Sequence, residues 1–160
     1  MKPSLRLLAA ALVTFSFAAC SKPGPATAAA PAAKHEHQAP HGGTPIVLGH
    51  EAYHLELVRD AAAGRLTAYV LDGEMNNFVR VKTASFELVA SGGAAKRVLV
   101  FHAIANPATG ETVGDTSQFE ARADWLKTEA TFDATLTALD IRGTAFTAVV
   151  FNFPKGNDRD

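Results

Sequence analysis

Hydrophobic and polar residues alternate with a period of two along most of the chain after residue 50. Leu55 and Leu57, for example, fall on the opposite side of the backbone from Glu56. Because successive side chains of a β-strand point to opposite faces, this alternation predicts strands that place one face in a core. The pattern predicts strands at residues 52–58, 65–71, 77–82, 85–90, 97–104, 118–123, 132–139 and 144–153.

Turn-forming residues separate these segments, and they favour an all-β fold. They are Asp72-Gly73, Ser91-Gly92-Gly93, Asn106-Pro107 and Arg142-Gly143. Several short alternating strands with such punctuation are typical of a sandwich or barrel. We therefore expect an immunoglobulin-like β-sandwich over residues 44–154, with one short helical turn at 123–130 and a disordered tail at 155–160.

The first 19 residues predict a signal peptide. Two basic residues precede an apolar stretch at 7–19, which is shorter than the roughly 20 residues that a membrane-spanning helix needs. The stretch ends at Cys20, and Phe17-Ala18-Ala19-Cys20 resembles the lipobox of bacterial lipoproteins, although Phe17 stands where an aliphatic residue is usual. The resemblance implies acylation of Cys20 after cleavage. The alternative is an ordinary secretory signal followed by a chance cysteine.

Composition after the leader narrows the possible partners. Removing residues 1–19 leaves 160 − 19 = 141 residues, with 15 − 2 = 13 basic and 16 acidic side chains. This mildly acidic balance offers no electrostatic attraction for nucleic acid. Ser21 after the cysteine resembles the signal for outer-membrane sorting, so we expect a lipid-anchored protein of the bacterial cell envelope that faces the periplasm. With Cys20 lipidated, no thiol remains for a disulfide or a thiolate metal site.

Histidines crowd the segment that follows. Residues 20–43 are rich in Ala, Pro, Gly and Lys and predict a flexible tether, because they cannot bury enough apolar surface to fold. His35, His37 and His41 lie at the end of this tether. Gly42-Gly43 gives the backbone enough freedom to fold back over the first strand.

Residues 50–54, His-Glu-Ala-Tyr-His, match the HExxH motif of zinc hydrolases. That chemistry requires a helix, since only a helix brings His50 and His54 to one face. The alternation from Tyr53 onward predicts a strand instead, and Glu74, a possible third ligand, would lie beside a tight turn. We therefore expect no enzyme, and the zinc hydrolase stays a minor alternative.

On a strand, the same residues suggest a binding site. His54 and Glu56 project from one face, as a metal-binding pair or as an ion pair at the solvent surface. A composite metal site is physically possible, and nitrogen and oxygen ligands favour Zn(II), Cu(II) or Ni(II). Its candidate ligands are His35, His37, His41, His50, His54 and Glu56. In the alternative interpretation, the tether histidines are solvated spacers and His54 is a surface residue. His102, among apolar residues, predicts a half-buried strand residue.

The run PHGGTPIVLGHEAYHLELVRDAAAGRLTAYVLDG, residues 40–73, resembles a segment of small bacterial envelope lipoproteins. It also resembles an N-terminal module of the periplasmic adaptor subunits of heavy-metal efflux pumps. The resemblance implies an envelope β-domain associated with divalent metals, and it carries over His41, Gly42, Gly43, His54 and Glu56. It further implies a metal-efflux or other envelope protein as a partner. The chain lacks the helical hairpin and lipoyl-like parts of an adaptor. The alternative function is a structural or protein-interaction domain without a specific metal site.

Overall fold

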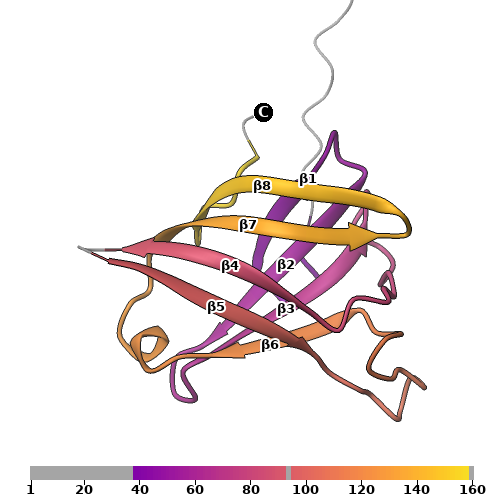
Figure 1. Ribbon diagram of the computed structural model, residues 1–160, viewed down its shortest axis with the longest axis horizontal. Helices are drawn as coiled ribbons and strands as arrows, with labels where there is room; N and C mark the ends of the chain where they lie inside the picture. Colours follow the sequence, from indigo (N-terminus) through magenta and orange to yellow (C-terminus); the bar gives the residue numbers. More distant parts are fainter. Residues whose placement is uncertain (1–37, 93–94, 159–160) are drawn as a thin grey trace, which may run out of the picture. The chain divides into compact units, whose positions relative to one another are not determined.

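Eight antiparallel strands form the domain (Figure 1), in a computed structural model that describes residues 38–92 and 95–158. The strands are β1 (Thr44–Leu48), β2 (Tyr53–Asp60), β3 (Arg65–Asp72), β4 (Ser85–Gly92), β5 (Ala95–Ala103), β6 (Gln118–Arg122), β7 (Phe132–Ile141) and β8 (Thr144–Phe153). The only helical element in these two ranges is the 3-10 turn η1 (Asp124–Lys127). The prediction of an all-β fold is confirmed.

The strands belong to one nearly closed sheet, in the order β1-β2-β3-β6-β5-β4-β7-β8. An immunoglobulin-like sandwich has two separate sheets, so the arrangement differs from the expected one in this respect. The physical reason is that β6 pairs with β3 on one side and with β5 on the other, which joins the two halves of the sheet. The remaining end strand, β1, is held by hydrogen bonds to the segment that follows β8.

Residues after β8 make these contacts. Thr44 Oγ1 donates to the carbonyl of Pro154 at 3.2 Å. The side-chain amide of Asn157 accepts a hydrogen bond from Val47 N at 2.7 Å and donates one to Val47 O at 3.0 Å. It therefore satisfies the backbone groups of Val47 that a neighbouring strand would otherwise bind at this edge of β1. The prediction of a disordered tail from residue 155 is therefore wrong for the part up to Asn157.

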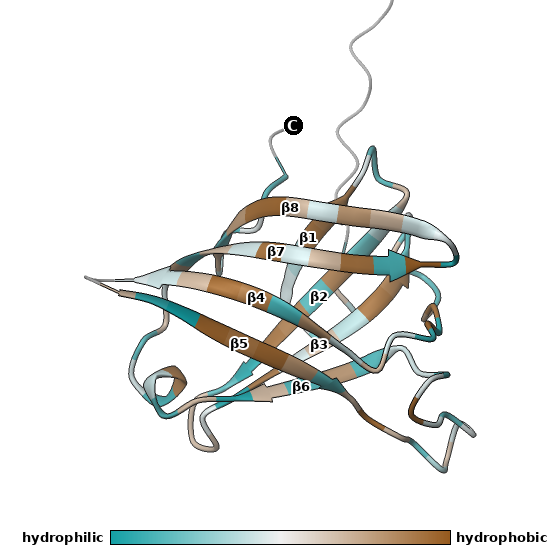
Figure 2. Ribbon diagram, in the orientation of Figure 1, coloured by the Kyte–Doolittle hydropathy of each residue, from teal (hydrophilic) through white to brown (hydrophobic). Residues whose placement is uncertain are grey.

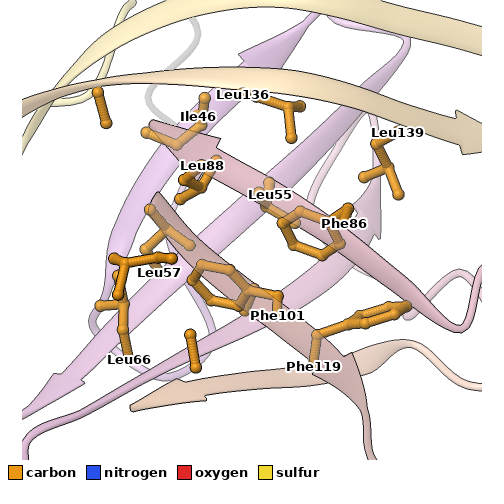
Figure 3. Packing of buried hydrophobic residues seen from close by; sticks show 14 of the residues in the cluster. Ile46, Leu55, Leu57, Leu66, Phe86, Leu88, Phe101, Phe119, Leu136 and Leu139 are labelled. Carbon is orange, nitrogen blue, oxygen red and sulfur yellow. The ribbon is translucent and has the colours of Figure 1, made fainter. Parts of the chain in front are cut away.

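The interior of the sheet is filled by the apolar face of every strand. Figure 3 shows side chains from different strands converging there, among them Leu55, Phe101 and Phe119. Phe101 stacks on Phe86, with ring centroids 4.8 Å apart and planes within 4°. Colouring by hydropathy shows apolar and polar positions interleaved along the strands (Figure 2). The alternation in the sequence is thus the alternation between the core and the outer face.

Seven of the eight predicted strands correspond to β2 through β8, and the differences have clear causes. Segment 77–82 forms only isolated bridges, Leu71 to Phe78 and Val81 to Thr116. Its alternation is nevertheless real, because Val79 and Val81 are both buried. Strand β1 was not predicted as a separate element, since its five residues are too few to establish a period. The short helical turn expected at 123–130 is η1.

Candidate functional site

A buried carboxylate on β2 organises the site. Glu56 is on the outer face of β2, opposite Tyr69 of β3, and its side chain has no solvent exposure. Its Oε1 accepts hydrogen bonds from the backbone N–H groups of His41 and Gly43, at 2.8 and 2.9 Å. Its Oε2 accepts from Nδ1 of the His41 ring at 2.8 Å. Since a buried charge is costly unless it is paired and hydrogen-bonded, these contacts are what allow Glu56 to be buried.

The two glycines after His41 allow the chain to reach Glu56. Gly42 adopts a left-handed conformation with φ of +65°, which glycine reaches without strain. Gly43 lies directly against β2, where an added Cβ would meet the carbonyl oxygen of Leu57 at 2.6 Å. Residues 41–43, the end of the predicted tether, therefore lie back over β2 as part of the folded domain, which the freedom of the glycine backbone permits.

The His41 ring is held in a defined orientation. It stacks on the ring of Tyr69 with centroids 3.9 Å apart and planes within 14°, and the ring of Phe78 lies 5.7 Å away. Because a carboxylate can only accept, Nδ1 carries the proton that it donates to Glu56, and the lone pair of the neutral ring is on Nε2. The side chain is 36% exposed, so one face of the site is open to solvent.

Electrostatics around the site follow from the buried carboxylate. Burial raises the pKa of Tyr69, and the negative charge of Glu56 raises it further. Tyr69 and Phe78 were not among the candidate site residues that the sequence suggested. The alternation places Tyr69 on the polar face of its strand, but only the register between β2 and β3 shows that it faces Glu56.

His54 is fully buried, and so is Glu56, so the alternatives of an ion pair at the solvent surface and of His54 as a surface residue are wrong. Its strand neighbours are Val47 of β1 and Leu71 of β3, and its Nδ1 is 3.4 Å from the carbonyl oxygen of Asp72. A hydrogen bond from the Asn77 side chain, partly opposed by desolvation, lowers the pKa of Asp72. The two residues do share one face of β2, as the alternation predicts, but both are covered.

The other half of the HExxH motif lies in a turn. His50 and Glu51 belong to the connection between β1 and β2, His50 is exposed, and Glu51 has a φ of +56°. His54 lies in the following strand, β2, so His50 and His54 do not share one face of a helix. Glu74 is an exposed residue of the connection after β3. The strand predicted from Tyr53 onward is confirmed.

Of the candidate metal ligands, the structure brings together His41 and Glu56. Within the ranges 38–92 and 95–158, no three His, Asp, Glu or Cys side chains are grouped so that they could hold a metal ion. His35, His37, Cys20 and the leader lie outside those ranges. His102 is exposed on the outer face of β5, which corrects the expectation of a half-buried residue, because its neighbours Phe101 and Ala103 are the ones that face the core.

Replacement of Gly43 by alanine is expected to lower the free energy of unfolding by about 1–3 kcal/mol, the usual cost of overpacking. The new methyl group would press on the backbone of β2, which cannot move aside. Gly42→Ala is the matched control, since a Cβ there meets nothing within 4 Å and only the positive φ adds strain. Urea unfolding of both variants checks the difference, and equal stabilities would contradict close packing of this segment.

Within the described part of the chain, no helix is long and apolar enough to cross a membrane. Comparisons with protein-family models, with curated proteins and with solved structures found no match for this chain.

Proposed function

We propose that this chain is a membrane-anchored, non-enzymatic lipoprotein of the bacterial envelope that binds a divalent transition metal through Nε2 of His41. The observation that supports the metal site is the hydrogen bond from His41 Nδ1 to the buried carboxylate of Glu56. Histidines that bind metals almost always donate their other ring N–H to a carboxylate, a carbonyl or a water, which sets the tautomer and raises the basicity of the ligand. His41 has this arrangement, and it is exposed on one side.

The remaining ligands would come from the segment just before His41. His35 and His37 precede it in the sequence KHEHQAPHGG, so a chelate of imidazoles can form around an ion that His41 positions. Imidazole nitrogens favour Zn(II), Cu(II) and Ni(II). In this proposal, the orientation of His41 is preset by the folded domain and the other histidines close around the metal.

The second candidate function is a structural or protein-interaction domain of the envelope. Here the contact between His41 and Glu56 only fastens the N-terminal segment to the sheet. The observation that favours it is that both carboxylate oxygens of Glu56 are already used, two of their three bonds being to backbone N–H groups. The two candidate functions differ in whether Nε2 of His41 binds a metal ion.

Calorimetric titration of the full-length chain with Zn(II), Cu(II) and Ni(II) distinguishes them. We expect His41→Ala to weaken binding at least ~10-fold, the scale on which changes around a metal site act. His102→Ala is the matched control, because His102 is also exposed but lies on β5. Equal affinity of wild type and His41→Ala would contradict the proposed site and leave the structural function.

Glu56→Gln tests the role of the carboxylate. The amide of glutamine would donate to Nδ1 of His41, so the ring would switch its proton to Nε2 and lose the lone pair that binds the metal. We expect affinity to fall by ~10–100-fold while the domain stays folded. Circular dichroism verifies folding in the same samples. Undiminished affinity in this variant would show that Glu56 does not set the tautomer of a metal ligand.

A further inference from the structure

Strand β5 is paired along its whole length on only one side. Its ladder with β4 runs from Ala95 to His102, whereas its ladder with β6 consists of His102 and Ala103. From there, β5 and β6 diverge toward η1 (Figure 1). The first part of β5 is therefore a sheet edge inside an otherwise nearly closed sheet.

The register identifies the backbone groups at this edge. Ile104 donates its N–H to Gln118 on the β6 side, whereas Ala103 donates to Ala84 on the β4 side. Because the directions alternate along a strand and the β4 ladder continues without a bulge, the even-numbered residues of β5 face the gap. Lys96, Val98 and Val100 thus direct their N–H and C=O groups toward it, and no strand in the described ranges pairs with them there.

The same residues leave apolar side chains in solvent. Val98 is 57% exposed and Val100 38% exposed. A groove of about 490 Å³ lies beside them, lined by Val98, Leu99, Val100, His102, Ile104, Glu120 and Arg122. Residues Val98 to Phe101 form an uncharged, strongly β-prone run, visible as the brown stretch of β5 in Figure 2. Such an edge, without proline or bulge, is a template for pairing with another strand.

We propose that this edge pairs with the same edge of a second copy of the chain, in an antiparallel dimer with its two-fold axis at Val98. This register pairs Val98 with the partner's Val98, and it pairs Lys96 with the partner's Val100. All three outward-facing backbone positions then find partners, and the pairing between the copies ends before His102, where the pairing of β5 with β6 begins. The valines of the two copies cover one another, and the aliphatic stem of Lys96 lies along Val100.

A second copy of the chain suits this edge because the edge complements itself. An isologous interface needs a surface that complements itself under two-fold rotation. The open backbone groups lie symmetrically about Val98, at Lys96 and Val100, and the side chains in the register contain no like charges directly opposite each other. Any other partner would have to bring its own unpaired strand edge, which a second copy already possesses.

Sedimentation equilibrium of the full-length chain tests the proposal. We expect a monomer–dimer equilibrium for the wild type and a dissociation constant at least ~10-fold higher for Val98→Lys, because two ammonium groups would face each other across the axis. Val150→Lys is the matched control, since Val150 is a 63% exposed strand residue of β8. A wild type that stays monomeric, a Val98→Lys variant that dimerises with the dissociation constant of the wild type, or a Val150→Lys variant whose dimer is weakened as much as that of Val98→Lys would each overturn the proposal.

A crosslinking experiment verifies the register. In a Cys20→Ser background, which removes the only native cysteine, Val98→Cys is treated with a short bismaleimide. We expect crosslinked dimer from Val98→Cys and none from Val150→Cys at the same protein concentration. Equal yields from the two positions would show that contact is not centred on Val98.

Discussion

Glu56→Ala is expected to lower the free energy of unfolding by about 3 kcal/mol. The substitution removes the acceptor of three hydrogen bonds, two of them from backbone N–H groups of His41 and Gly43. Hydrogen bonds to charged groups contribute about 1.5–3 kcal/mol each, and donors left without a partner add to the loss. Part of that loss is recovered because residues 41–43 are near the surface and can reach water. Urea unfolding followed by circular dichroism measures the change.

Glu87→Ala is the matched control for this prediction. Glu87 is also a strand glutamate, but it is exposed on β4. Surface substitutions of this kind usually change stability by less than about 0.5 kcal/mol. If the two variants lost the same small amount, Glu56 would not hold the N-terminal segment to the sheet, and the basis for a preset His41 would disappear with it.

Phe101→Ala is expected to be the most destabilising single substitution considered, with a loss of about 3–5 kcal/mol. The Phe101 side chain is fully buried, and it stacks on Phe86, which in turn contacts Phe119 at 5.1 Å between centroids. Removing the ring leaves a cavity among side chains of β4, β5 and β6, and the long ladder between β4 and β5 limits how far these strands can move to fill it. Thermal and urea unfolding measure the loss.

Two variants serve as references for Phe101. Phe101→Leu keeps most of the volume and should cost clearly less than the alanine variant. Phe78→Ala removes a ring that is 49% exposed and should cost less than about 1 kcal/mol. A loss at Phe101 no greater than that at Phe78 would mean that the interior of the sheet is not close-packed.

The alternation of the sequence was sufficient to predict an all-β domain and most of its strands. This succeeded because one face of each strand is buried, so a period of two is imposed on the residues themselves. The closure of the sheet could not be predicted in this way. It depends on contacts such as that between Val47 and Asn157, which lie at opposite ends of the domain in sequence.

The candidate site, like the fold, could be predicted only in part from the sequence. From the sequence, His41, Gly42, Gly43, His54 and Glu56 could be selected, and the freedom of the glycines allowed the segment to fold back. The burial of Glu56 could not be predicted, because alternation places it on the polar face and says nothing of what covers that face.

Only the tertiary structure decides that covering. Residues 41–43 lie over β2, where Glu56 accepts hydrogen bonds from the backbone N–H groups of His41 and Gly43. The ring of His41 stacks on Tyr69 of β3. The sequence by itself determined which residue types are available for a metal and that residues 53–58 form a strand. The fold determined which of them meet, because hydrogen bonds and ring contacts between distant segments depend on register and packing, which no local pattern encodes.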